Sequence, residues 1–278
     1  MTAAGGLRVG HIPYLNCVPF FYHLKRSGFD GELVSGVPSA LNDMLQQGRI
    51  DVSPSSSFEY ARHWRDYLLL PNHSITSAGA VQSVLLFSPV PLHELENRQI
   101  AITGESATSI NLMRVILREY VGLNNVTDAV PDGLIEDHIS AGHPALLIGD
   151  RALQQRMRPS SGMICFDLGE LWYRYTGLPF CFALWMVRKG ALGTYRQQLL
   201  DLDAQLTQSR QTFLQTEQQV AADVASASGL NAAQKRDYWK RIDYGFDDNS
   251  RQGTALFFEL CYKYQLLDER PEFMFLTD

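Results

Sequence analysis

The sequence predicts an α/β protein of two lobes with a ligand cleft between them. Predicted strands and helices alternate through the first and middle thirds, a rhythm typical of parallel sheets with helices on both faces. The 278 residues exceed the usual length of one domain. Two long apolar runs, 81–88 and 180–187, bracket the middle segment like a pair of crossover strands. We therefore expect a discontinuous first lobe, residues 1–88 plus 188–278, and a second lobe, residues 89–187.

The first third of the chain predicts strand–helix pairs. Strands are expected at 7–12, 32–37 and 50–52, and helices at 16–27, 38–47 and 56–64. Pro38 suits the first turn of its helix and Gly48 its end. Extended runs follow at 67–70, 74–78 and 81–88, of which the last is apolar enough to be buried on both faces.

The middle segment repeats this alternation, and the remainder is mostly helical. Strands are expected at 99–103, 126–130 and 145–148, and helices at 108–120, 132–141 and 151–157. A short strand and a helix fit 165–175, before the apolar run 180–187. After Gly190 we expect helices that pack back on the first sheet, with breaks near Gly229 and 244–248.

Composition and charge exclude several classes of function. The formal net charge is −6, and no cluster of Lys and Arg suits nucleic-acid phosphates. No basic amphipathic helix and no bilayer-length apolar run occurs, so we expect no membrane partner. The first residues carry no signal-peptide pattern, which predicts a cytoplasmic protein. Four cysteines without CxxC spacing are expected to be buried thiols: Cys17, Cys165, Cys181 and Cys261.

Motifs for common cofactors are absent from the sequence. No GxGxxG, GxxxxGK[ST], HExxH or GxSxG pattern occurs. His63 and His73 lack the spacing of metal ligands and are expected at the surface or in loops. We therefore expect neither a metal nor an organic cofactor.

Polar residues gather at two predicted strand ends of the first lobe, where ligands of open α/β sheets bind. Asn16 follows the first strand, in PYLNC at 13–17, and either caps the next helix or faces the cleft. Ser55, Ser56 and Ser57 precede another helix; Ser56 and Glu59 have capping-box spacing. Three consecutive hydroxyls exceed what a cap needs and indicate an anion-binding edge.

Two further strand ends belong to the second lobe. Ser106, Thr108 and Ser109 open a helix after a Gly turn, which suits either a simple cap or a bound carboxylate. Asp150 follows the strand at 145–148 and can cap the next helix, pair with Arg151 or face the cleft as a base. The spacing leaves these three roles of Asp150 open.

Six short blocks in the sequence resemble the chorismate dehydratases of the futalosine route to menaquinone. They are IPYLNCVP at 12–19, GRIDVSP at 48–54, SVLLFS at 83–88, SATS at 106–109, LIGDR at 147–151 and WYRYTGLPF at 172–180. The blocks keep the family's order, and the resemblance extends from residue 7 to about residue 267. The sister enzyme that releases dihydroxynaphthoate typically has a Ser-Pro-Cys-Pro-Asn type of motif, where this chain has YLNC at 14–17.

The resemblance implies a type II periplasmic-binding-protein fold and a cofactor-free lyase that removes water from chorismate. Tyr14 and Ser83 lie in the matching blocks and join the hydroxyls above as substrate-binding candidates. Asn16 is expected to orient the substrate or the departing hydroxyl, because an amide is not a base near neutral pH. The base is either Asp150 or the enolpyruvyl carboxylate of chorismate itself. A solute-binding protein or a ligand sensor remains the alternative, since the fold alone does not decide function.

Overall fold

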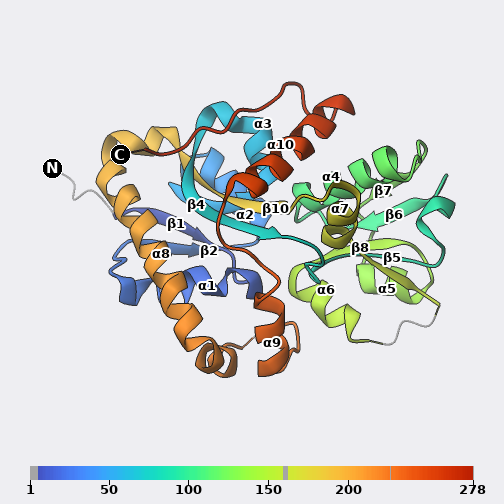
Figure 1. Ribbon diagram of the computed structural model, residues 1–278, viewed down its shortest axis with the longest axis horizontal. Coiled ribbons are helices and arrows are strands. Elements are labelled where there is room, and N and C mark those ends of the chain that lie inside the picture. The colour runs from blue at the N-terminus through green and yellow to red at the C-terminus, as the bar shows by residue number, and fades with distance from the viewer. Residues whose placement is uncertain (1–5, 159–161, 226, 278) are drawn as a thin grey trace.

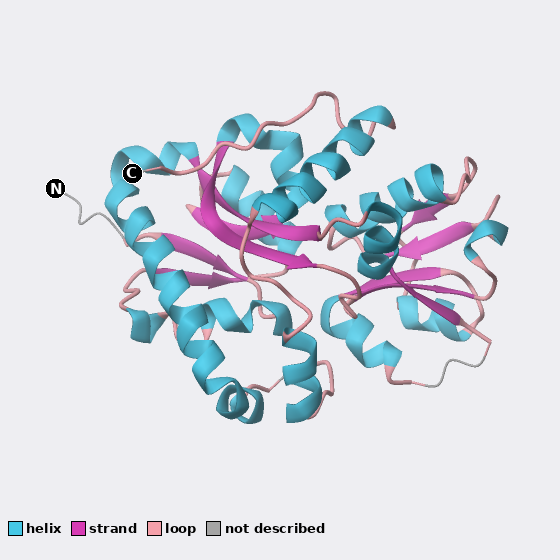
Figure 2. Cartoon of the chain, viewed as in Figure 1, coloured by secondary structure: helices cyan, strands magenta, loops and turns pink. Residues whose placement is uncertain are grey.

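A computed structural model describes residues 6–158, 162–225 and 227–277. Two five-stranded sheets lie side by side (Figure 1), and helices cover both of them (Figure 2). Each sheet with its helices forms one lobe, which confirms the predicted two-lobed α/β class. Among the helices described, none combines the length and apolar character that a membrane span requires.

The first sheet has the strand order β2-β1-β3-β10-β4. β1 pairs in parallel with β2 and β3, whereas β10 runs antiparallel to β3 and β4. The sheet is mixed, not parallel throughout as the alternation predicts, because β10 enters it on the way back from the second lobe. Its strands are β1 (Arg8–His11), β2 (Glu32–Ser35), β3 (Val52–Ser56), β4 (Tyr67–Ser77) and β10 (Phe180–Arg188).

The second sheet has the strand order β7-β6-β8-β5-β9. β6 pairs in parallel with β7 and β8, and β5 runs antiparallel to β8 and β9. This sheet repeats the plan of the first, with one antiparallel strand between its neighbours. Its strands are β5 (Val84–Ser88), β6 (Gln99–Ile102), β7 (Thr127–Ala129), β8 (Ala145–Ile148) and β9 (Ile164–Asp167).

Both apolar crossover runs lie in the opposite sheet from the one expected. β5 belongs to the second sheet and β10 to the first, so the strand pairing corrects the expected boundaries at 88 and 187. The chain passes between the sheets at 78–83 and again at 177–179. A run buried on both faces suits the centre of either sheet, and its hydrophobicity therefore does not identify which one.

Helices fill the connections and cover the faces of the sheets. The C-terminal helices return to the first lobe as expected, with α8 against α1 and α10 against β10 (Figure 1). The helices are α1 (Val18–Phe21), α2 (Pro38–Gln46), α3 (Ser57–His63), α4 (Ala107–Val115), α5 (Ile135–Ser140), α6 (Gly149–Arg156), α7 (Leu168–Thr176), α8 (Leu192–Asp223), α9 (Ala232–Trp239) and α10 (Asp248–Lys263).

Local structure differs from the sequence predictions at several places. The expected helix 16–27 is reduced to α1 between two short 3₁₀ turns. The expected strands 67–70 and 74–78 form one strand, β4, which accommodates Pro71 because β4 lies at the edge of the sheet. His73 is fully buried in that strand, not in a loop. Cys165 is exposed on the edge strand β9, whereas the other three cysteines are buried.

Candidate active site

A small cavity of about 70 Å³ lies between the two lobes, where the polar strand-end residues of both meet. Seven of the ten residues singled out from the sequence lie in its wall: Tyr14, Asn16, Ser55, Ser56, Ser83, Ser106 and Ser109. The rest of the wall is mostly apolar and consists of Ile12, Cys17, Pro38, Ile75, Val81, Val84, Ile148, Gly149, Phe182 and Ala183. The cavity wall thus combines neutral polar side chains with apolar ones. The polar side chains are the ones that can form hydrogen bonds with a ligand.

Two polar atoms in this wall have no hydrogen-bond partner among the described residues: Asn16 Oδ1 and Ser55 Oγ. Asn16 lies inside a 3₁₀ turn, Leu15–Cys17, and makes no cap hydrogen bond, so the capping alternative for Asn16 is wrong. Ser55 is fully buried in β3. A buried polar group without a partner costs about 1–3 kcal/mol, and a polar ligand in the cavity removes this cost.

Ser56 and Ser106 cap helices and also line the cavity. Ser56 Oγ accepts from the backbone N–H of Glu59 at 3.3 Å, at the start of α3. Ser106 Oγ accepts from the N–H of Ser109 at 3.3 Å, at the start of α4. The Ser106 and Ser109 hydroxyls lie 3.1 Å apart. The start of α4 therefore presents two hydroxyls to the cavity at the positive end of the helix dipole.

Ser57 and Thr108 lie outside the cavity wall and join the lobes instead. Thr108 Oγ1 accepts from the backbone N–H of Phe58 at 2.9 Å and lies 3.3 Å from Ser57 Oγ. Ser57 Oγ donates to the carbonyl of Cys181 at 2.8 Å. Both side chains are fully buried. Their expected substrate-binding role stays a prediction. The helical turn that points Ser106 and Ser109 at the cavity turns Thr108 toward α3.

Asp150 also lies outside the wall, in the first turn of α6. Asp150 Oδ1 accepts from the backbone N–H of Leu15 at 3.1 Å and so ties the second lobe to the loop that carries Asn16. Asp150 is not the N-cap of α6. Arg151 forms a two-pronged ion pair with Glu136, at 2.9 and 2.6 Å. Asp150 thus does not cap α6, and Arg151 is held by Glu136. The role of Asp150 as a base stays a prediction.

Glu105 and Tyr238 contact the wall and were not singled out from the sequence. The Tyr14 hydroxyl donates to Glu105 Oε2 at 3.1 Å, across the two lobes. Burial, with the nearby Glu105 charge, raises the pKa of Tyr14 well above its ordinary value. Tyr238 donates to Ser83 Oγ at 2.9 Å from α9. The GES turn at 104–106 offered a signal for Glu105, whereas Tyr238 lies 155 residues from its partner and offered none.

The wall carries no positive charge among its described residues. An anion in the cavity therefore interacts with neutral hydroxyls, backbone N–H groups and the α4 dipole. Nor does any group of three His, Cys, Asp or Glu side chains within 6–158, 162–225 and 227–277 have an arrangement that suits a metal ion.

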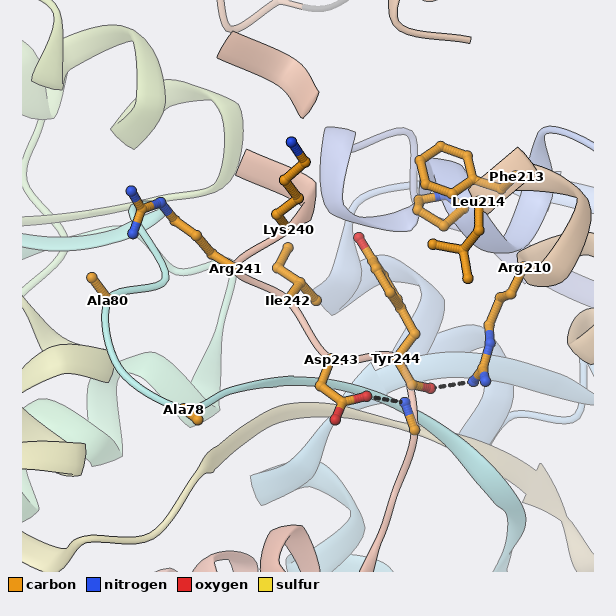
Figure 3. Close-up of a pocket in the computed structure, with 12 residues that line it drawn as sticks. Ala78, Ala80, Arg210, Phe213, Leu214, Lys240, Arg241, Ile242, Asp243 and Tyr244 are labelled. Carbon is orange, nitrogen blue, oxygen red and sulfur yellow. Dashed lines mark hydrogen bonds between the residues drawn. The ribbon is translucent and has the colours of Figure 1, made fainter. Parts of the chain in front are cut away.

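A second hollow, on the first lobe, shares no residue with the cavity (Figure 3). Three cationic residues line it, Arg210, Lys240 and Arg241. Arg210 is engaged with the carbonyls of Asn72 and Tyr244, and the guanidinium of Arg241 lies 2.6 Å from the amide of Gln82. Arg210 thus bonds backbone carbonyls, and Arg241 faces a side-chain amide. We therefore assign the functional site to the cavity between the lobes.

The two α/β lobes with a cavity between them place this protein in the class with a periplasmic-binding-protein-like fold. The alkanesulfonate-binding protein SsuA from Xanthomonas axonopodis pv. citri, solved with bound MOPS, superposes with a TM-score of 0.70. The superposition covers 97% of both chains at 14% sequence identity. At this identity the likeness concerns the fold alone, and it confirms the predicted fold class.

Sequence comparison identifies the family more closely. Residues 7–263 match the family model described as menaquinone biosynthesis, and this chain belongs to that family. A chorismate dehydratase of Thermus thermophilus is 30% identical over 88% of this chain and 92% of its own length. A chorismate dehydratase of Campylobacter jejuni is 33% identical over 68% of this chain and 70% of its own length. The predicted family is confirmed.

Proposed function

We propose that this protein is a chorismate dehydratase, a hydro-lyase that converts chorismate to 3-[(1-carboxyvinyl)oxy]benzoate and water. Family membership and the two chorismate dehydratase relatives support the substrate. The observation that carries the proposal is the pair of unpartnered atoms in the wall, Asn16 Oδ1 and Ser55 Oγ. Such atoms suit a polar ligand, in a wall that combines hydroxyl groups with apolar side chains.

Neutral donors bind the two carboxylates of the substrate in this proposal. The Ser106 and Ser109 hydroxyls, at the start of α4, bind one carboxylate together with the helix dipole. Ser55 and Ser83 are further hydroxyl donors in the cavity wall. The net charge of −6 repels a dianion at long range, so binding depends on these local groups.

The reaction removes the C4 hydroxyl of chorismate and a ring proton as water, and the ring becomes aromatic. The substrate itself supplies the driving force, and no electrons are transferred to or from the protein. The enzyme holds the ring, assists departure of the hydroxide and excludes bulk water. Asn16 lies in the wall, and its Oδ1, which has no partner among the described residues, can accept a hydrogen bond from the C4 hydroxyl and so orient it for departure.

The proton acceptor in this proposal is the enolpyruvyl carboxylate of chorismate. Its tether keeps it close to the ring, which gives it the advantage of an intramolecular reaction. Asp150, the other candidate, is absent from the wall, and its Oδ1 accepts from the N–H of Leu15. Asp150 then acts as a positioning residue that holds the Asn16 loop against the second lobe.

Incubation of the purified protein with chorismate tests the proposed function, with proton NMR to detect the ring protons of a 3-substituted benzoate. Steady accumulation of this product beyond the amount of protein supports the enzyme. Stoichiometric binding of unchanged chorismate supports a solute-binding protein or a sensor and contradicts the proposal. Heat-denatured protein controls for the spontaneous breakdown of chorismate. We expect the reaction in the cytoplasm, and fractionation of cells tests that location.

A further inference from the structure

We infer that Tyr238 is a positioning residue that orients the hydroxyl proton of Ser83 into the cavity. The inference rests on the proposed function, because it assigns Ser83 a substrate oxygen as its hydrogen-bond acceptor. Tyr238 itself is absent from the cavity wall and acts through Ser83 alone.

The contact between the two side chains is short and fully enclosed. The Tyr238 hydroxyl donates to Ser83 Oγ at 2.9 Å. Tyr238 is 1% exposed and Ser83 is 3% exposed. Burial raises the pKa of Tyr238 far above its ordinary value, so the phenol keeps its proton and remains a donor.

The hydroxyl of Ser83 has a single proton and two lone pairs. Tyr238 occupies one lone pair, which turns the proton of Ser83 away from the phenol. No described residue accepts that proton in a hydrogen bond. Asn16 Oδ1, which also lies in the cavity wall, has no partner among the described residues either. Since Ser83 lines the cavity, the proton is available to an oxygen of a bound substrate.

The backbone around both residues fixes this geometry. The carbonyl of Ser83 accepts from the N–H of Gly149 at 2.8 Å, which anchors the crossover at 78–83 to the second lobe. Trp239, next to Tyr238, donates from Nε1 to the carbonyl of Leu15 at 2.7 Å. The end of α9 therefore holds two parts of the wall at once, the Ser83 crossover and the Asn16 loop.

Tyr238→Phe removes the hydroxyl and keeps the ring. We expect kcat/KM for chorismate to fall about tenfold, since a hydrogen bond to a charged oxygen is weakened. In a Ser83→Ala background the same change should alter kcat/KM by less than about twofold, because the two residues act as one unit. An equal loss in both backgrounds, or no loss in the Tyr238→Phe protein, overturns the inference.

Tyr60→Phe is the matched control. Tyr60 is also fully buried, and its hydroxyl bonds the carbonyl of Glu272 at 2.7 Å and the N–H of Met274 at 2.8 Å, outside the cavity wall. This variant should lose stability and keep its kcat/KM. If Tyr60→Phe lost as much kcat/KM as Tyr238→Phe, weakened folding would explain both losses, and the positioning role would be contradicted.

A crystal structure of the Tyr238→Phe protein tests the inference without any substrate. The inference predicts that Ser83 Oγ leaves its wild-type position once the phenol is absent. An unchanged Ser83 conformation contradicts it. If the wild-type protein fails to convert chorismate, the proposed function fails, while this structure still decides whether Tyr238 positions Ser83.

Discussion

Tyr14 of the first lobe donates a hydrogen bond to Glu105 of the second lobe, at 3.1 Å, beside the cavity. Two more hydrogen bonds cross between the lobes close by, from the N–H of Leu15 to Asp150 and from the N–H of Phe58 to Thr108. The two lobes are therefore in contact around the cavity in this structure. We expect the lobes to separate for exchange of substrate and product, by bending at the crossovers 78–83 and 177–179.

Glu105→Gln should lower KM for chorismate by about threefold at low ionic strength. The amide keeps an acceptor for the Tyr14 hydroxyl, and the change removes a negative charge that repels a dianionic substrate. Steady-state kinetics at low and high salt measure the effect, which should shrink in high salt. Glu94→Gln, on the same lobe and exposed, is the control with the same charge change. A raised KM for Glu105→Gln contradicts the prediction.

Gly149→Ala should lower both stability and activity. Gly149 has φ +60, and an added Cβ would lie 3.3 Å from the ring of Tyr14. Left-handed backbone costs a residue with a side chain about 1–2 kcal/mol. Gly142→Ala shares the strain, at φ +80, but its Cβ meets nothing within 4 Å. Thermal melts should show a loss for both variants, and kcat/KM should fall only for Gly149→Ala. If kcat/KM were the same for the two variants, the position of the Tyr14 ring would not matter for activity, which contradicts the prediction.

Glu136→Gln should lower the stability of the protein at neutral pH but not in acid. The hydrogen bond from Arg151 holds the pKa of Glu136 below its usual value of 4.5. A lowered pKa contributes stability above that value, and the contribution disappears as pH falls through the folded-state pKa. The pair is partly exposed, so its worth is at most about 1 kcal/mol. Melting temperatures of the two proteins should differ at pH 7 and converge below pH 4.5.

Glu170→Gln breaks the exposed pair with Arg174 and serves as the control for the preceding variant. It should change the melting temperature little at either pH, because exposed ion pairs contribute little. If the difference in melting temperature between wild type and Glu136→Gln became larger in acid, the pKa of Glu136 would be raised by folding, not lowered, and the prediction would be wrong.

Exhaustive chelation should leave chorismate turnover unchanged. The proposed chemistry needs hydrogen-bond donors and a proton acceptor, and the sequence has no ligand-spaced His, Cys or acidic cluster. Turnover is measured before and after dialysis against a chelator. Loss of activity that a divalent metal restores would contradict the prediction.

The sequence predicted the two lobes and the polar residues of the cavity wall because both depend on local patterns. Asn16 and Ser106 both follow predicted strands, and ligands of open α/β sheets bind beyond the carboxyl ends of strands. The sequence does not show which side chains at the start of a helix point into the cavity. Ser109 lies in the wall, whereas the neighbouring Thr108 accepts a hydrogen bond from Phe58. The partner of Ser83 lies 155 residues away, and only the folded chain brings Tyr238 to it.

The sheet boundaries were mispredicted for a different reason. The runs that became β5 and β10 are both apolar and buried, so their composition suits either sheet. Their pairing depends on contacts far along the chain, such as Leu85 with Asp167 and Trp185 with Pro54. Hydrophobic periodicity carries no information on such partners.

The comparison of Asn16→Ala with Asp150→Asn in chorismate turnover tests the central claim most directly. The Asn16→Ala protein should fold and bind chorismate but lose most of its kcat, because the amide in the wall assists the departing hydroxyl. The Asp150→Asn protein keeps an oxygen to accept from the N–H of Leu15, and should retain measurable turnover. An inactive Asp150→Asn protein that still binds chorismate normally would make Asp150 the base and contradict substrate assistance. Full activity of Asn16→Ala would contradict the proposed site itself.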